Sequence, residues 1–284
     1  KTNSSKQSFF WFNSLCALEN NPYHTPFKQI NFAPLRETNI IQTSPSYAQS
    51  PFSQYLQPTR IVVLTRAGIS AESGIPTFRG AGGLWEGHRI EDVASPEGWN
   101  KNPELVLDFY NQRRRGILSA QPNAAHIQLA ALDAHHEIQI ITQNIDDLHE
   151  RAGSKNILHL HGEILKARSV KNPNLITSIN GDIQIGDVAA DGAQLRPHIV
   201  WFGEQVPMLE MAIPLVEQAE ILVIIGTSMV VYPAAGLLHY ASPEIPVYVI
   251  NPEITEISRR KNIHFIQKNA GEGVTEFIRL VLTK

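Results

Sequence analysis

Three short stretches of this sequence combine residue types that suit a nucleotide ligand and an acid–base reaction. They are RAGIS at 66–70, QNID at 143–146 and HLHG at 159–162. Small residues let the backbone approach phosphate groups, amides and carboxylates bind ribose hydroxyls, and histidine exchanges a proton near neutral pH. If the fold brings these stretches together, they form a nucleotide site. A histidine at the end of a strand is, on sequence alone, more often structural than catalytic.

The elements that must position these stretches are short apolar runs separated by helical patterns. The runs are continuously apolar, as in strands covered on both faces, and lie at 61–65, 137–142, 156–160, 198–202, 220–226, 247–250 and 264–266. Apolar residues at three- and four-residue spacing predict helices at 102–117, 123–136, 207–220 and 273–284. This alternation predicts an α/β fold with a doubly wound, Rossmann-like parallel sheet. Residues 80–120 and the strand-poor residues 166–196 are candidates for a smaller inserted lobe.

Polar loops follow several of the predicted strands, including residues 143–146, 227–228 and 251–253. In an open parallel sheet such loops gather at the carboxyl edge, where ligands bind. Glycine, serine and asparagine also occur in these turns simply as helix caps. One loop alone favours the cap, whereas several together favour a ligand with phosphates and riboses.

The composition is that of an ordinary globular protein of 284 residues, with a formal net charge of −3. This balance gives no electrostatic reason to expect nucleic acid or an anionic membrane as a partner. No apolar run approaches the roughly 20 residues that span a bilayer. Cys16 is the single cysteine, which excludes an intramolecular disulfide and a cysteine-based zinc site.

Residues 1–57 differ from the rest, because they are rich in asparagine, serine, glutamine, threonine and proline and have no sustained period. We expect an irregular N-terminal extension. An apolar patch at 8–18 follows Lys6 but lacks the long core of a signal peptide and the arginines of a transit peptide. We therefore expect a cytoplasmic protein, with targeting or processing of this end left open.

The ordered motifs of the remaining chain resemble those of sirtuins, which are NAD-dependent protein lysine deacylases. They are AGIS-AESGIP-FR (67–79), TQNIDDLHERAG (142–153), HLHGE (159–163), LRPHIVWFGE (195–204), GTS (226–228) and INPE (250–253). The resemblance covers residues 58–284 and implies one sirtuin catalytic domain there, with the small lobe at about 80–120 and 166–196. A lone glycine-rich turn would be weak evidence, whereas this order of motifs is specific.

One further motif resembles the bacterial CobB-like sirtuins, which remove succinyl and malonyl as well as acetyl groups. It is Tyr110-Asn111-Gln112-Arg113. A succinyl or malonyl carboxylate needs a buried cation, which Arg113 supplies, and Tyr110 adds a hydroxyl one helical turn away. Ala94, by resemblance, leaves room for the acyl group. Without the family match, three adjacent arginines at 113–115 are more simply a solvated helix face.

The resemblance implies that the nicotinamide–ribose bond of NAD is cleaved and that the acyl group passes to ADP-ribose. The implied catalytic residues are His161, Asn144 and Asp146, with His161 as the base. The expected cofactor-binding residues are Arg66, Ala67, Gly68, Ser70, Thr77, Phe78, Arg79, Trp85, Gln143, Asn144, Ile145, Asp146, Gly226, Thr227, Ser228, Asn251, Pro252, Glu253 and Ala270.

The acylated substrate has its own implied residues. Phe202, Gly203 and Glu204 resemble the strand that pairs with a substrate peptide by β-augmentation. Ala94, Tyr110 and Arg113 complete the expected substrate-binding set. Three more histidines occupy family-like places, and we expect them to pack or cap rather than react: His126, His149 and His198. The sequence does not indicate an oligomeric state.

The chain departs from the family pattern at two points. Most sirtuins hold a structural zinc with four cysteines in the small lobe; here Ser169 stands in that region, and Asp182, Asp187 and Asp191 suit turns better than a zinc site. We therefore expect NAD but no zinc.

Arg66 is the second departure, because the family has glycine there. A positive φ would disfavour arginine, and the side chain would intrude on the diphosphate, although a guanidinium also attracts phosphate. We expect weaker NAD binding, which Arg66→Gly should restore.

Three functions compete. NAD-dependent deacylation leads, ADP-ribosyl transfer uses the same activated ribose, and a degenerate sirtuin would bind an ADP-ribose-like ligand or a partner without turnover. An unrelated Rossmann oxidoreductase is disfavoured, because residues 142–146, 159–162 and 201–204 have no role there.

Overall fold

The computed structural model describes residues 58–77, 84–85, 87–227, 234–253 and 261–282. The chain divides into two units, Lys1–Gln49 and Ser50–Lys284, and all described residues belong to the second. The predicted N-terminal extension therefore lies outside the described residues. Its boundary with the catalytic domain stays a prediction.

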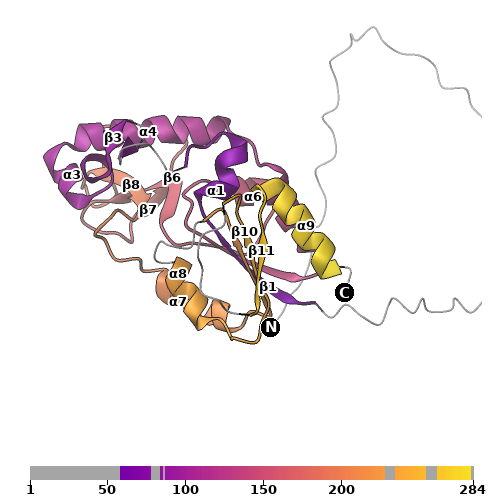
Figure 1. The fold of residues 1–284 in the computed structure, drawn as a ribbon. Helices are drawn as coiled ribbons and strands as arrows, with labels where there is room; N and C mark the ends of the chain where they lie inside the picture. The colour runs from indigo at the N-terminus through magenta and orange to yellow at the C-terminus, as the bar shows by residue number, and fades with distance from the viewer. Residues whose placement is uncertain (1–57, 78–83, 86, 228–233, 254–260, 283–284) are drawn as a thin grey trace, which may run out of the picture. The chain divides into compact units, whose positions relative to one another are not determined.

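A parallel sheet of six strands, in the order β11-β10-β9-β1-β4-β5, forms the centre of the fold (Figure 1). Renumbered along the chain within this sheet, the order is 6-5-4-1-2-3, which is that of the Rossmann fold. The predicted fold class is therefore confirmed. The strands are β1 (Arg60–Thr65), β4 (Glu137–Thr142), β5 (Ile157–His159), β9 (Ile221–Ile225), β10 (Val247–Ile250) and β11 (Ile263–Ile266).

Both faces of this sheet are buried because successive strand residues point to opposite sides. Along β1, Ile61 and Val63 join one apolar cluster, whereas Val62 and Leu64 join the other. The first cluster takes in α5 and α9, and the second takes in α7. This two-sided burial explains why the strands are continuously apolar.

The helices follow the predicted pattern with shifts of a few residues at their ends. Two of them, α1 and α6, are short helices directly after strand-end loops. The helices are α1 (Ala67–Ser70), α2 (Ile90–Val93), α3 (Pro96–Lys101), α4 (Pro103–Ser119), α5 (Ala124–Leu132), α6 (Leu148–Ala152), α7 (Leu209–Glu217), α8 (Ala234–Leu237) and α9 (Ala270–Leu282), with short 3-10 turns η2 (Ala71–Ser73) and η4 (Leu238–Tyr240).

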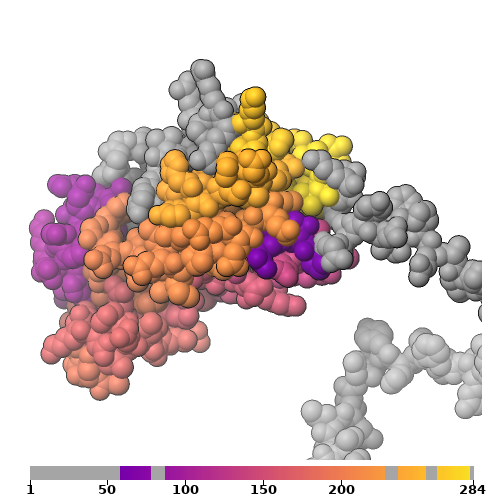
Figure 2. Space-filling view, turned by 90° about the horizontal axis from the view of Figure 1, so that it is seen from below, coloured from indigo at the N-terminus to yellow at the C-terminus, as the bar shows by residue number. Residues whose placement is uncertain are grey.

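Figure 2 shows the segment around α7, in orange, at the surface of the face seen from below. Within the described ranges, no helix has both the length and the apolar character needed to cross a bilayer.

A second, antiparallel sheet corrects two predictions. It has the order β7-β6-β8, with β6 at Gly162–Ser169, β7 at Ile176–Ser178 and β8 at Leu195–Ile199. Residues 166–196, expected to be strand-poor, therefore carry parts of three strands. The run at 198–202 was expected to be a strand of the parallel sheet. Its first two residues instead form the end of β8, which stops at Ile199. A short hairpin, β2 (Leu84–Trp85) with β3 (His88–Arg89), precedes α2.

Helix α4 is fixed to this second sheet by a buried arginine. Arg114 Nε donates to the carbonyl of Ile164 at 2.9 Å, and its Nη1 donates to Asn111 Oδ1 at 2.6 Å. Asn111 in turn accepts from the backbone N–H of Ile183 at 2.9 Å. Burial of a guanidinium is tolerated only with such partners. The rotation of α4 about its axis is thereby set.

The small-lobe loop that follows β6 is held by hydrogen bonds centred on Ser169. Its hydroxyl donates to Asp191 Oδ2 at 2.7 Å and accepts from the N–H groups of Lys171 and Asn172 at 3.0 and 3.1 Å. Among the described residues, no group of three or more histidine, cysteine, aspartate or glutamate side chains is arranged to hold a metal ion. The absence of zinc stays a prediction.

We expect Ser169→Ala to destabilise the fold by about 1 kcal/mol, because two part-buried N–H groups lose their acceptor. Chemical denaturation monitored by tryptophan fluorescence measures this. Ser178→Ala, at an exposed position of β7, is the matched control and should leave the midpoint in place. Equal midpoints for the two variants would contradict the role given to Ser169.

Candidate active site

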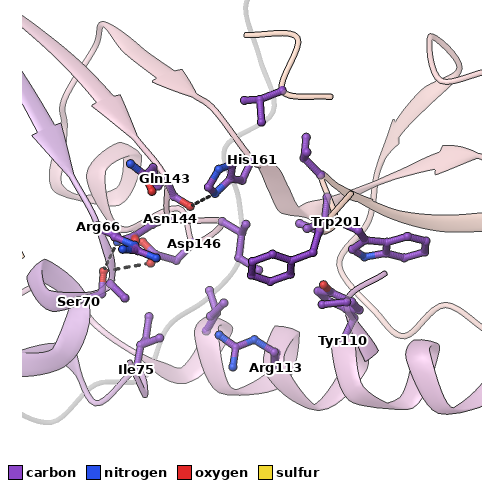
Figure 3. A pocket seen from close by; sticks show the side chains of 18 of the residues that line it. Arg66, Ser70, Ile75, Tyr110, Arg113, Gln143, Asn144, Asp146, His161 and Trp201 are labelled. Atoms are coloured by element: carbon purple, nitrogen blue, oxygen red, sulfur yellow. Dashed lines mark hydrogen bonds between the residues drawn. The ribbon is translucent and has the colours of Figure 1, made fainter. Parts of the chain in front are cut away.

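Two cavities lie against the carboxyl ends of the central strands, as expected for an open parallel sheet. The first has a volume of about 280 Å³ and the second about 600 Å³. Arg66 and Ala67, directly after β1, line both. The first cavity, shown in Figure 3, is also lined by Ser70, Ala94, Tyr110, Arg113, Gln143, Asn144, Ile145, Asp146, His161, Phe202, Gly203 and Glu204. The second is lined by Gly68, Thr77, Gly226, Thr227, Asn251, Pro252, Glu253 and Ala270.

Two glycines let the strand-end turns of β1 and β9 approach each other. A Cβ atom on Gly68 would lie 2.5 Å from the Cα of Gly226, closer than any side chain tolerates. Gly226 has a φ of 71°, which other residues rarely adopt. The N–H of Gly68 donates to the carbonyl of Gly226 at 3.1 Å. At these two glycines the turns pack backbone against backbone, and both glycines line the second cavity.

A hydrogen-bond chain in the first cavity joins the loop after β1 to the loop after β4 (Figure 3). Asn144 Nδ2 donates to Ser70 Oγ at 3.0 Å, and Ser70 Oγ donates to Asp146 Oδ2 at 3.0 Å. The N–H of Leu148 donates to Asp146 Oδ1 at 3.2 Å. Burial is the largest influence on Asp146 and raises its pKa, although these donors oppose the shift. The carboxylate is therefore fixed in orientation beside the cavity.

His161 is oriented by a backbone carbonyl. Its Nδ1 lies 3.1 Å from the carbonyl oxygen of Gln143, which only accepts, so Nδ1 carries the proton and Nε2 is left as the base. Burial lowers the pKa of His161, the positive charge of Arg66 lowers it further, and the Gln143 carbonyl opposes both. Near neutral pH the ring is uncharged. His159, by contrast, contacts Glu150 at 2.7 Å and does not line either cavity.

Gln143 presents an unused acceptor to the first cavity. Its side chain is 8% exposed, and its Oε1 accepts no hydrogen bond from the part of the chain that the structure describes. A buried acceptor without a donor is unfavourable unless a ligand or water supplies one. Two adjoining cavities, one at the glycine-containing turns after β1 and β9 and the other lined by amides and a carboxylate, fit a dinucleotide.

The far end of the first cavity is apolar and contains a buried cation. Arg113 is 8% exposed, and its guanidinium carbon lies 5.7 Å from the centre of the Phe109 ring. Tyr110 lines the same cavity one helical turn earlier, and burial raises its pKa, so its hydroxyl remains protonated. Ala94 also lies here, as expected. The apolar walls are residues that the sequence did not single out: Ile75, Pro76, Ile117, Ile199, Trp201 and Val206.

Two sequence expectations about backbone conformation are wrong. Arg66 has a φ of −140°, so its backbone is extended and an arginine is unstrained there. Residues 202–204 form a turn rather than a strand, with Gly203 at a φ of 87°. The N–H of Phe202 donates to the carbonyl of Ala94 at 2.9 Å.

The side chain of Glu204 is engaged within the protein. It pairs with Arg196 at 2.8 Å and accepts from the N–H of Trp201 at 2.8 Å. Arg196 in turn lies 3.2 Å from the centre of the Trp201 ring. Glu204 therefore fixes the Trp201 wall of the cavity, in addition to lining it.

The remaining expected residues are not all described. Phe78, Arg79 and Ser228 lie outside the described residues, as does the side chain of Trp85, although its backbone belongs to β2. The three additional histidines are partly explained. His126 caps α5 by accepting from the N–H of Asn123 at 3.4 Å, and His149 Nε2 lies 3.1 Å from Thr65 Oγ1.

We expect the rate of any reaction that uses His161 as a base to rise with pH through a pKa below 6.5. The sign follows from burial, which favours the neutral ring and so makes the base available at lower pH. Removing the nearby charge in Arg66→Gly should move this acid limb to higher pH. Profiles of kcat/KM between pH 5 and 8, recorded for the wild type and for Arg66→Gly, measure the pKa and its change. An acid limb at the same pH in both proteins would contradict the influence of Arg66 on His161.

Comparisons with known proteins agree with this geometry. A model of the Sir2 family matches residues 66–233. An NAD-dependent protein deacylase of Helicobacter pylori J99 is 58% identical over 77% of this chain and 93% of its own length. One of Bacteroides thetaiotaomicron is 51% identical over 78% of this chain and 97% of its own length.

Solved structures give the same result. A mutant Sir2 homologue bound to ADP-ribose has a TM-score of 0.72 and 40% identity, over 78% of this chain and 92% of that one. A Sir2 homologue bound to NAD has a TM-score of 0.70 and 40% identity, over 78% and 89%. A Sir2 mutant bound to a deacetylated p53 peptide and 3′-O-acetyl ADP-ribose has a TM-score of 0.66 and 31% identity, over 78% and 92%.

Proposed function

This chain belongs to the Sir2 family, and from that premise we propose how it works as an NAD-dependent protein deacylase. It removes succinyl, malonyl and acetyl groups from protein lysines, and the products are nicotinamide and O-acyl-ADP-ribose. The inclusion of succinyl and malonyl groups rests on one observation: Arg113 is a buried cation at the apolar end of the first cavity.

NAD supplies, when bound, an activated ribose carbon that gives up nicotinamide and takes the acyl oxygen. The residues of the second cavity hold the adenosine and diphosphate portions, mainly through backbone groups at Gly68 and Gly226. Relatives of the fold crystallised with NAD and ADP-ribose support this assignment.

The catalytic residues lie on the loops after β4 and β5. His161 accepts a proton at Nε2, since Nδ1 is committed to the Gln143 carbonyl. Asn144 and Asp146, coupled through Ser70, position the ribose and its hydroxyls. Gln143 offers its unused Oε1 to a donor on the ligand. The apolar walls formed by Ile117 and Ile199 keep water from the acyl group.

The acyl group enters the first cavity at its apolar end, away from the second cavity. Arg113 binds the succinyl or malonyl carboxylate, and the protonated Tyr110 hydroxyl donates to it. An acetyl group leaves this end empty and depends on the apolar walls alone. The substrates are acylated proteins, in keeping with the peptide complex of a structural relative. The cytoplasmic location stays a prediction.

The test uses NAD with matched acetyl-, malonyl- and succinyl-lysine peptides of one sequence, following nicotinamide release and peptide mass. Deacylation coupled to nicotinamide release is the expected result. Nicotinamide release without a change in peptide mass would point to ADP-ribosyl transfer or hydrolysis. No NAD consumption would point to a binding protein and contradict the proposal.

A further inference from the structure

Arg66 stands where the two cavities meet. Of the described residues, it and Ala67 are the ones that line both, so a ligand that fills both must pass Arg66. Its backbone is fixed, because its N–H donates to the carbonyl of Ile225 at 3.1 Å and its carbonyl accepts from the N–H of Ile69 at 2.9 Å. Its side chain is half-buried at this junction.

The charge of Arg66 matters at both sides of this junction. In the second cavity, Arg66 is the one cationic residue in the described lining, against the carboxylates Glu72 and Glu253. In the first cavity, Figure 3 shows Arg66 on the side of Ser70, Asn144 and Asp146, whereas Arg113 lies on the helix below. Arg66 and His161 line the same cavity, and the positive charge of Arg66 lowers the pKa of His161.

We propose that Arg66 makes this site select dinucleotides by the charge of the group beyond the diphosphate. This inference rests on the proposed function, which places the nicotinamide end of NAD in the first cavity. The nicotinamide ring of NAD is positively charged, whereas NADH has a neutral ring and ADP-ribose has none. The diphosphate is common to all three, so its attraction to Arg66 cancels in a comparison among them.

The expected consequence is weaker binding of NAD than of ligands without the positive ring. Two like charges separated by a few ångströms in a half-buried site repel by an amount that corresponds to about tenfold in affinity. O-acyl-ADP-ribose, the product, lacks the positive ring as well. Arg66 thus weakens the binding of NAD relative to that of the product.

The test is isothermal titration of the full chain with NAD and with NADH, which have nearly the same shape and differ in ring charge. The Kd for NAD is divided by the Kd for NADH in the wild type, and this quotient is divided by the same quotient in Arg66→Gly. We expect this double ratio to be about ten, because Arg66 weakens the binding of NAD alone. Arg66→Gln, which keeps a polar side chain without charge, should behave like Arg66→Gly.

The outcomes separate this inference from the proposed function. A double ratio near one, with normal deacylation, would overturn the charge selection alone. A change in Arg66→Gly that Arg66→Gln does not share would also overturn it, since bulk rather than charge would be responsible. Failure of the wild type and both variants to bind either dinucleotide would overturn the proposed function together with the inference.

Discussion

His161→Asn should lower kcat/KM for deacylation by about 10²- to 10⁴-fold, the usual contribution of a positioned base. The side chain lines the first cavity, and its Nδ1 is committed to the Gln143 carbonyl, so only Nε2 is left to take a proton. Asparagine has no group that does this near neutral pH. Turnover assayed by nicotinamide release, with NAD affinity measured separately by titration, gives the comparison.

His159→Asn is the matched control, two residues earlier in the same segment. His159 contacts Glu150 and the carbonyl of Asn144 and lines neither cavity. This variant should retain most of the activity. NAD affinity of His161→Asn should stay close to that of the wild type, because the second cavity is untouched. A His161→Asn enzyme with near-normal kcat/KM would remove His161 from the role of base.

Arg113→Met should lower kcat/KM for a succinyl-lysine peptide by about 30- to 150-fold, because loss of a charged hydrogen bond in a buried site costs about 2–3 kcal/mol. The same variant should keep activity toward the acetyl-lysine peptide, since the acetyl group has no carboxylate. Methionine has a similar length and suits the apolar walls. Parallel assays on two peptides of identical sequence measure the change in preference.

Arg115→Met provides the control on the same helix. Arg115 is exposed and pairs with Asp182, away from the cavity. It should leave both activities unchanged. Equal losses of desuccinylation and deacetylation in Arg113→Met would show that Arg113 supports the helix rather than the acyl carboxylate.

The parallel sheet could be predicted from the sequence because burial on both faces leaves a direct signal. The run at 61–65 is apolar up to its last residue, Thr65, the run at 247–250 consists of valine, tyrosine and isoleucine, and each is followed by a polar loop. The second sheet could not be predicted in this way. Arg168 and Arg196 lie on its strands β6 and β8, and this mixed composition hides the strand pattern.

The resemblance of the motifs to those of sirtuins placed His161, Asn144 and Arg113 in one site, and the structure brings all three to the first cavity. The sequence did not predict features of the site that depend on backbone conformation. Arg66 has an extended backbone, and Glu204 forms an internal ion pair in a turn, neither of which its residue type reveals. The apolar walls were missed because residues such as Ile117 and Ile199 are ordinary core residues in sequence and meet only through tertiary packing.

The most direct test of the whole account is the identity of the small-molecule product. Limiting succinyl-lysine peptide is incubated with NAD and the wild-type chain, and the products are identified by mass. We predict one nicotinamide, one O-succinyl-ADP-ribose and one unmodified lysine peptide for each peptide consumed. Free succinate with NAD left intact, or ADP-ribose without loss of succinyl, would contradict the account.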